Sequence, residues 1–146
     1  MTEREIIDCI QNINEKNKIR KIDNFSHKIE DKDLHLLIMP SHKWFWTTAA
    51  EILQYIGFPR LEIVLPDLLV WLQDMNWPGA DKVINILSTC KPKLILPFIE
   101  NALKTAAAED DTMWIAGIKK LISNLEIKED DFSDKDIIHL LTLSDY

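Results

Sequence analysis

Three consecutive acids, Glu109-Asp110-Asp111, are the clearest candidates for acid–base or metal chemistry. Neighbouring carboxylates can bind a divalent cation, or one can donate a proton while another accepts one. A run of this kind more often begins a helix, where a carboxylate accepts hydrogen bonds from the first backbone N–H groups and complements the positive helix end. We therefore expect Asp110 and Asp111 to cap a helix, with acid–base chemistry as the alternative.

The other reactive side chains form no recognised site. The four histidines are His27, His35, His42 and His139. None lies four residues from another or directly before a glutamate, which are the spacings of helical metal sites. Cys9 and Cys90 belong to no Cys-x-x-Cys unit, so we expect reduced thiols. The motifs of phosphate-binding loops, nucleophilic serines and zinc proteases are absent. The sequence predicts no catalytic residue, no metal and no cofactor.

The tryptophans are candidates for recognition rather than catalysis. Adjacent residues of a helix point about 100° apart, so the rings of Trp44-Phe45-Trp46 cannot all enter one core. At least one should reach the surface, and an exposed Trp near Asp and Asn side chains has the composition of a protein-binding hot spot. Burial beneath an N-terminal helix is the alternative for this segment. We expect Trp71, Trp77 and Trp114 to fill space between helices.

A threefold repeat indicates which elements position these residues. Segments of ten residues that start at Thr47, Asp81 and Ala116, 34 and 35 residues apart, carry apolar residues at their third, sixth, seventh and tenth positions. This spacing is one face of a helix. A tryptophan-bearing turn and a further apolar segment precede each stripe. The stripes are Ala49, Ile52, Leu53 and Ile56; Val83, Ile86, Leu87 and Cys90; and Ile118, Leu121, Ile122 and Leu125.

Self-similarity at this period is the mark of stacked helical hairpins. The predicted helices are Thr47–Ile56, Leu65–Asp74, Asp81–Cys90, Pro97–Ala107 and Met113–Leu125, and Leu34, Leu37 and Ile38 would open the first hairpin. We also expect an N-terminal helix from Ile6, a polar loop over Asn14–Asn24 and a last helix that starts with a capping box at Ser133. The sequence thus predicts one all-α domain over residues 1–146, a right-handed solenoid of about three hairpins with capping helices.

The turn between the two helices of a hairpin, here called an elbow, carries the most distinctive sequence. In Trp71-Leu72-Gln73-Asp74-Met75-Asn76-Trp77-Pro78, Asp74 and Asn76 supply turn-forming oxygens, and Pro78 suits a first helical turn. With Leu68-Leu69 before it and Asp110-Asp111-Thr112-Met113-Trp114 after it, this elbow resembles the signature of an uncharacterised bacterial family of small HEAT-like proteins. The resemblance covers roughly Leu61 to Leu125. It implies an α-α superhelix and no reaction.

Charge and hydropathy exclude several classes of partner. Twenty-four acids outweigh seventeen bases, for a formal net charge of −7, and nucleic acid is excluded because polyanions require a concentrated basic surface. No apolar run reaches the roughly 18 residues that cross a bilayer, and the N-terminus lacks the order of a signal peptide. We therefore expect a cytoplasmic protein with no membrane partner. Acids predominate beyond Leu125: Glu126, Glu129, Asp130, Asp131, Asp134, Asp136 and Asp145.

These features favour a non-enzymatic protein-binding module that uses the inner surface of the stacked hairpins. Its more specific form is an immunity-type inhibitor that covers a basic toxin or enzyme with an acidic surface. A small-ligand-binding protein or a hydrolase with acids at the elbows is the alternative. The oligomeric state is left open. The residues predicted to contact the partner are Trp44, Trp46, Asp74, Asn76, Asp110 and Asp111.

Overall fold

The computed structural model describes residues 1–144, and over this range the chain is all-α with no strand, as predicted. Eight α-helices and five short 3₁₀ helices (η) make up this part of the chain. The α-helices are α1 (Glu3–Gln11), α2 (Lys18–Lys28), α3 (Trp46–Ile56), α4 (Leu65–Val70), α5 (Ala80–Leu87), α6 (Pro92–Ala108), α7 (Thr112–Asn124) and α8 (Asp136–Leu141). The 3₁₀ helices are η1 (Asp31–Leu37), η2 (Lys43–Phe45), η3 (Arg60–Val64), η4 (Trp71–Gln73) and η5 (Glu129–Asp131). Asp145 lies outside the described residues.

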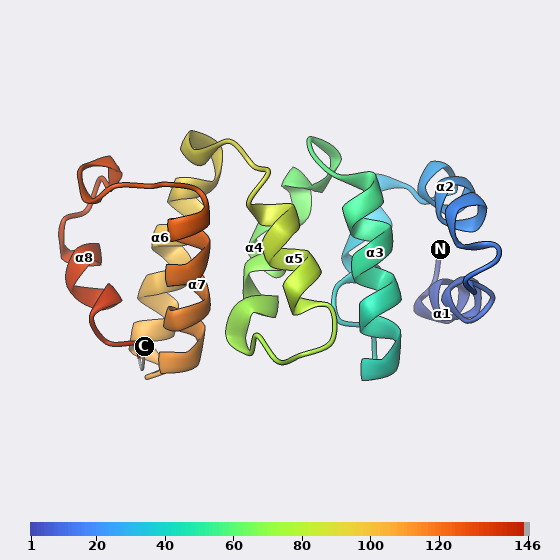
Figure 1. The fold of residues 1–146 in the computed structure, drawn as a ribbon, viewed down its shortest axis with the longest axis horizontal. Coiled ribbons are helices and arrows are strands. Elements are labelled where there is room, and N and C mark those ends of the chain that lie inside the picture. The colour runs from blue at the N-terminus through green and yellow to red at the C-terminus, as the bar shows by residue number, and fades with distance from the viewer. Residues whose placement is uncertain (145–146) are drawn as a thin grey trace.

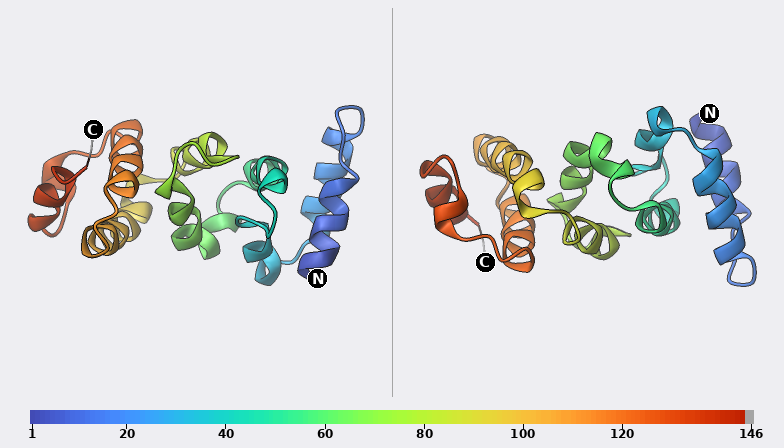
Figure 2. Two further views of the ribbon diagram at one scale, coloured as in Figure 1. Left: turned by 90° about the horizontal axis from the view of Figure 1, so that it is seen from below. Right: turned by 90° about the horizontal axis from the view of Figure 1, so that it is seen from above.

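The helices stand side by side in a row, with α1 and α2 at one end and α8 at the other (Figure 1). The two views of Figure 2 show that α3, α5 and α7 form one layer, whereas α4 and α6 form a second layer that η1 continues. Within the layers α3 contacts α5 and α4 contacts α6, and α6 also packs against α7. Each element therefore packs mainly on elements that are close to it in the chain.

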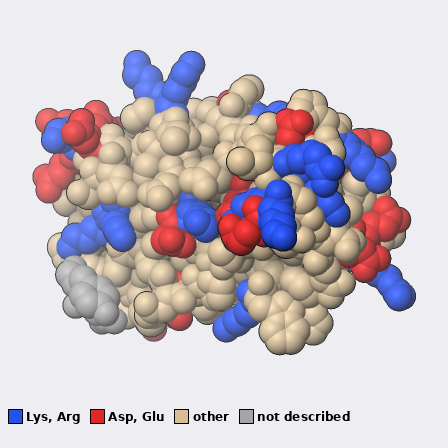
Figure 3. Space-filling model, turned by 45° about the vertical axis from the view of Figure 1, so that its right-hand side comes forward, with Lys and Arg blue, Asp and Glu red and all other residues tan. Residues whose placement is uncertain are grey.

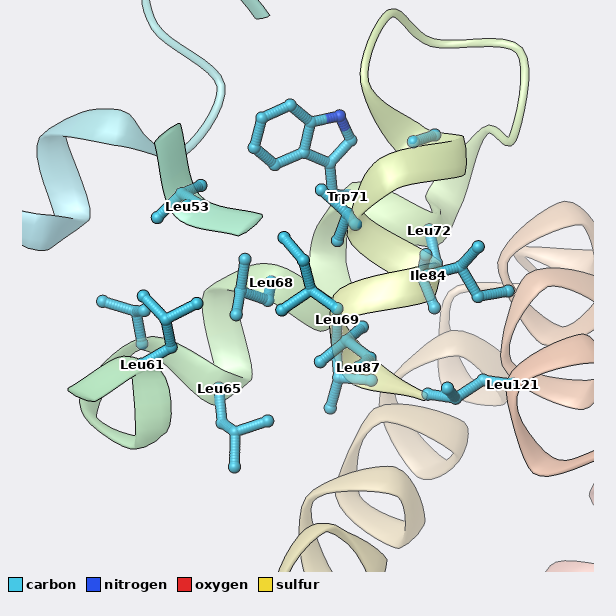
Figure 4. Close-up of a cluster of buried hydrophobic side chains, with 14 of the residues drawn as sticks. Leu53, Leu61, Leu65, Leu68, Leu69, Trp71, Leu72, Ile84, Leu87 and Leu121 are labelled. Atoms are coloured by element: carbon cyan, nitrogen blue, oxygen red, sulfur yellow. The ribbon is translucent and has the colours of Figure 1, made fainter. Parts of the chain in front are cut away.

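The three repeated stripes lie at the centre of the hydrophobic core. All stripe residues except Ile56 are buried, including the predicted equivalents Leu53, Leu87 and Ile122. Helix α4 faces them with three buried leucines of its own, and Figure 4 shows side chains of α3, α4, α5 and α7 in one cluster. The helical period of these apolar residues thus predicts the core correctly, because each stripe is buried against the neighbouring hairpin.

Several boundaries agree closely with the sequence prediction. Helix α3 ends at Ile56, and Gly57 follows with φ of +63°, a left-handed conformation that glycine adopts without a steric penalty. The predicted helix over Leu65–Asp74 is shorter than expected, because α4 ends at Val70 and the chain tightens into η4. Tightening of the last turn into a 3₁₀ helix is a common way to satisfy backbone groups at a helix end.

Two prolines take positions other than those predicted. Pro78 does not enter the first turn of α5, because Gly79 follows it with φ of +82° and the helix starts at Ala80. Helix α6 begins at Pro92 rather than Pro97, so Pro97 lies inside the helix and lacks the N–H that would bond to the preceding turn. At 17 residues α6 is the longest of these helices, and no helix in the described range is long and apolar enough to cross a membrane.

The polar loop predicted over Asn14–Asn24 is wrong, because α2 occupies Lys18–Lys28. Ile22, Phe25 and Ile29 are separated by three and four residues, so they share one helix face, and all three are buried. The stripe is short and lies among lysines, so the segment looks like a polar loop in the sequence. Lys18 also pairs with Glu51 of α3 at 2.6 Å between Nζ and Oε2, and this hydrogen bond raises the pKa of Lys18.

Arg60 connects the N-terminal helices to the rest of the protein. Its guanidinium donates hydrogen bonds to the backbone carbonyls of Ser26 and Ile29, at 2.7 and 2.9 Å, and its Nε donates to Asp31 at 2.8 Å. The last carbonyls of a helix have no partner within that helix, and a cation there complements the helix dipole. Arg60 therefore stabilises the C-terminal end of α2 against η3.

Two further predictions need correction at the ends of the fold. The first hairpin opens with a 3₁₀ helix, η1, rather than an α-helix, although Leu34 and Leu37 are buried as the pattern requires. Ser133 does not cap α8. Its backbone N–H and hydroxyl donate hydrogen bonds to the buried carboxylate of Glu100 in α6, at 2.9 and 2.8 Å. At the start of α8, the backbone N–H of Asp136 instead donates to the carboxylate of Asp134 at 2.9 Å.

Candidate functional site

The elbows of the three hairpins lie along one edge of the protein. In Figure 1 the start of α3, the α4–α5 connection and the α6–α7 connection all lie along the lower edge. We call this surface, made of residues 39–46, 74–79 and 109–111, the elbow edge. The predicted site residues are therefore brought to one side of the molecule, although they come from three separate turns.

The first elbow presents one tryptophan to solvent and buries the next. Trp44 is 79% exposed, whereas Phe45 and Trp46 are 9% and 8% exposed. This confirms that at least one of the three rings reaches the surface. The Trp44 ring lies 6.1 Å from Phe45 and 6.0 Å from His42 between centroids, so it rests against neighbouring rings instead of hanging free. Trp44 is thus an exposed aromatic side chain on a supported turn.

Trp46 is the centre of a cluster of three tryptophans from two hairpins. Its ring packs edge-to-face on Trp71 and Trp77, at 5.8 and 5.6 Å between centroids, and its indole N–H donates to the carbonyl of Pro40 at 2.5 Å. Trp71 is fully buried and donates to the carbonyl of Pro78 at 3.0 Å. Trp46 is therefore buried beneath the elbow edge and does not form its outer surface. Trp77, by contrast, is half-buried, so part of its ring reaches the surface.

Gly79 allows these two hairpins to approach. A Cβ at this position would lie 2.9 Å from the carbonyl oxygen of Trp46 and 3.0 Å from both Ala50 and Trp71. Distances this short exclude a side chain at Gly79, and its φ of +82° adds a second reason for glycine. The spacing of residues in the sequence gives no sign of this role, because the constraint arises from contacts between residues about thirty positions apart.

Lys43 is a further residue of the elbow edge that sequence reasoning missed. Its Nζ lies 5.7 Å from the ring centroid of Trp46 and 5.7 Å from that of Trp77, within the range of a cation–π interaction. The spacing of Lys43 and Trp46 in sequence is a weak signal of the first contact. Nothing in the sequence signals the second, which depends on the packing of two hairpins.

The second elbow is braced by Asp74. Its carboxylate accepts a hydrogen bond of 2.8 Å from the backbone N–H of Asn76, and its carbonyl accepts one of 3.0 Å from the N–H of Trp77. This arrangement is an Asx turn, in which a side-chain oxygen takes the place of a backbone acceptor. Asn76 enters the turn through its backbone, and its side chain is exposed.

The third elbow confirms the capping interpretation for Asp111. Its carboxylate accepts a hydrogen bond of 3.0 Å from the backbone N–H of Trp114, so Asp111 is the N-cap of α7. Asp110 is exposed and has φ of +53°, a left-handed conformation that Asp tolerates better than most residues. Asp74 and Asp111 thus hold backbone groups, whereas the side chain of Asp110 is exposed.

The described residues contain no group of three or more His, Cys, Asp or Glu side chains that could hold a metal ion. All four histidines are exposed, and two of them place Nδ1 near backbone carbonyls, His27 at 2.8 Å from Asp23 and His35 at 2.9 Å from Lys32. The two cysteines are free, and burial raises the pKa of the Cys90 thiol. The side chains that this edge presents are aromatic rings, a lysine and an exposed acid.

Acidic and basic side chains are interspersed on the face that Figure 3 shows. They alternate in a central band, a group of acids with some basic side chains lies at the upper left, and uncharged surface lies between these groups. A hollow with a volume of about 530 Å³ is lined by Lys91, Pro92, Lys93, Leu96, Ile127 and Asp131, away from the elbows. Another of about 350 Å³ lies between α4 and α6 and is lined mainly by apolar residues, among them Val70 and Phe98.

A family model described as a domain of unknown function, DUF5071, matches residues 38–142. The match covers more of the chain than the resemblance over Leu61 to Leu125, because it includes the first elbow and α8. No curated protein and no solved structure matches the chain.

Proposed function

The chain belongs to the DUF5071 family, a domain of unknown function, and we propose that it is a non-enzymatic protein-binding module whose contact surface is the elbow edge. The observation that carries the proposal is the exposure of Trp44, at 79%, on a turn supported by other aromatic rings. Tryptophan is among the residue types most enriched in binding hot spots.

The proposal includes a fold-level part, that the two layers form a short HEAT-like α-α superhelix. The threefold stripe with a period of 34 and 35 residues and the packing of each helix on its near neighbours support it. In such an array equivalent turns recur along one edge, which accounts for the common placement of the three elbows.

The elbow edge is already ordered in the free chain. Trp46 and Trp71 each bond a loop carbonyl, and Asp74 and Asp111 each bond a backbone N–H. A surface that is rigid before binding loses less conformational entropy when the partner arrives. This favours a binding role over a lid or hinge role for these turns.

A basic protein is the partner that the charge favours. The net charge of −7 attracts a cationic partner over a distance and raises the rate of encounter. The specific form of the proposal is therefore an immunity-type inhibitor of a basic toxin or enzyme, in which Asp110 provides an exposed charge on the same edge of the protein as Trp44. The rival function, a small-ligand-binding protein or hydrolase with acids at the elbows, has less support because the Asp74 and Asp111 carboxylates already serve as backbone caps.

Affinity capture from the native organism, followed by mass spectrometry, tests the proposal. Three baits are compared: the parent, Trp44→Ala, and Ile19→Ala as a control that removes another exposed apolar side chain, 83% exposed, from α2. A partner held by the parent and by Ile19→Ala but depleted with Trp44→Ala is the expected result. Equal capture by all three baits would rule out the elbow edge as the contact surface.

Salt dependence tests the charge part separately. Binding of the captured partner should weaken between about 50 and 300 mM salt, since exposed charges are screened beyond a Debye length near 10 Å. Asp110→Asn should weaken binding at the lower salt concentration and leave folding unchanged, because Asp110 is exposed and Asp111 is the cap. If neither the salt concentration nor Asp110→Asn alters the affinity, the electrostatic inhibitor role is wrong and only a protein-binding module remains proposed.

A further inference from the structure

The rings of Trp46 and Trp77 form a corner at the elbow edge. They meet at an interplanar angle of 88° with 5.6 Å between centroids, and they come from different hairpins. The two rings pack edge-to-face, and the face of an aromatic ring carries the negative potential that attracts a cation.

Lys43 occupies this corner in the free chain. Its Nζ is equidistant from the two ring centroids, at 5.7 Å from each. Lys43 itself is an exposed residue of the short helix η2, so solvent reaches its side chain. Trp77 is half-buried, and the 8% exposure of Trp46 is measured with the lysine in place.

We infer that the corner between Trp46 and Trp77 is a binding site for a cationic side chain, a lysine or arginine of a partner protein, and that Lys43 fills it until that cation arrives. The partner cation displaces the ammonium of Lys43 and takes over its contacts with both rings. The displaced lysine moves into solvent, which its exposed position on the turn allows.

Two observations support a replaceable cation rather than a fixed structural one. The contacts of Lys43 with the rings are not reinforced by a carboxylate at ion-pair distance among the described residues. The chain carries a net charge of −7, so it favours the approach of a basic partner.

This inference deepens the proposed function and rests on it for the identity of the partner, but its test needs no partner. The probe is choline, and its neutral isostere 3,3-dimethylbutan-1-ol is the control for apolar contact alone. The readout is the shift of the ¹H–¹⁵N indole signals of the tryptophans on titration. Trp44 serves as an internal reference, because its ring is exposed and lies outside the corner.

The expected result compares the parent with Lys43→Ala. The variant opens the corner, so choline should give saturable shifts of the Trp46 and Trp77 signals, with a dissociation constant at least about fivefold lower than in the parent. The neutral isostere should shift them far less. Lys120→Ala, which removes an exposed lysine from α7, is the matched control and should behave as the parent does.

A second variant keeps the test decisive. Lys43→Ala with Trp77→Leu removes one wall of the corner and should abolish the saturable shift, with circular dichroism as the check that the helices remain. Equal shifts by choline and its isostere, equal shifts of the Trp44 signal, or the absence of saturation in folded Lys43→Ala would each overturn the inference. None of these outcomes bears on capture through Trp44, so the two proposals can fail separately.

Discussion

The indole N–H of Trp114 donates a hydrogen bond of 3.0 Å to the backbone carbonyl of Leu69, 45 residues earlier in the chain. Leu69 lies where α4 tightens into η4, and its carbonyl also accepts from the backbone N–H of Trp71. Trp46 and Trp71 make equivalent bonds to the carbonyls of Pro40 and Pro78. The buried tryptophans thus supply both apolar volume and the donors that irregular backbone needs.

Trp114→Phe should lower the free energy of unfolding by about 1–3 kcal/mol, because most of the ring volume is kept while the buried Leu69 carbonyl loses its indole donor. Urea denaturation monitored by circular dichroism measures the change. Trp44→Phe is the control and should alter stability by no more than about 0.5 kcal/mol, since Trp44 is exposed. An unchanged midpoint in Trp114→Phe would show that the Leu69 carbonyl does not depend on this bond.

Leu87→Ala should cost about 2–5 kcal/mol, because Leu87 is fully buried in the stripe of α5 and its removal leaves a cavity. Asn85→Ala on the same helix is exposed and should be close to neutral. Both values come from the same denaturation measurement. If Leu87→Ala unfolds at the midpoint of the parent, the register of the repeated stripe is wrong.

Asp74→Ala should cost about 0.5–2 kcal/mol, the usual effect of losing a side chain that caps backbone N–H groups. Asn76→Ala should cost less, because Asn76 contributes its backbone to the turn and exposes its side chain. Thermal unfolding of the two variants under identical conditions ranks them. A larger loss in Asn76→Ala would mean that the asparagine braces this elbow, which is the role its place in the sequence signature suggests.

Asp134→Asn should destabilise the protein at neutral pH, and its difference from the parent should shrink as the pH falls below about 4. The backbone N–H of Asp136 and the ammonium of Lys104, at 2.9 and 3.3 Å, lower the pKa of the Asp134 carboxyl in the folded protein. Its folded pKa is below its unfolded value, so the stabilisation is present above roughly pH 4 and is lost as the pH falls through the folded pKa.

Urea denaturation at neutral pH and at a pH below about 4 measures this pH dependence. Asp130→Asn, in the same acidic segment but exposed, is the control and should change stability less than Asp134→Asn at neutral pH. A stability difference between parent and Asp134→Asn that is equal at both pH values would contradict the prediction.

The fold was predictable where a helix carries a regular apolar stripe of four residues. Leu53, Leu87 and Ile122 are buried equivalents because their helices carry four apolar residues each at a regular spacing. Helix α2 escaped detection because Ile22 and Phe25 stand among lysines, and the surface that buries them comes from other elements. Local spacing predicts which face a helix buries, but a short stripe becomes a helix only through its tertiary contacts.

The site was predictable only in part, for a similar reason. Trp44 could be expected at the surface from the crowding of three adjacent rings. The positions of Lys43 and Gly79 could not, since both depend on the meeting of two hairpins. Asp110 and Asp111 look alike in the sequence, yet Asp111 caps α7 whereas Asp110 takes a left-handed turn and exposes its side chain.

Because each helix packs mainly on elements near it in the chain, local unfolding should start at the two ends of the protein and proceed inward. Amide hydrogens in α1 and α8 would exchange with solvent through local openings that leave α4 and α5, which have hairpins on both sides, undisturbed. The same arrangement has an evolutionary consequence. A hairpin gained or lost at either end creates or removes a single interface, so the length of such a chain can change while its central contacts stay intact.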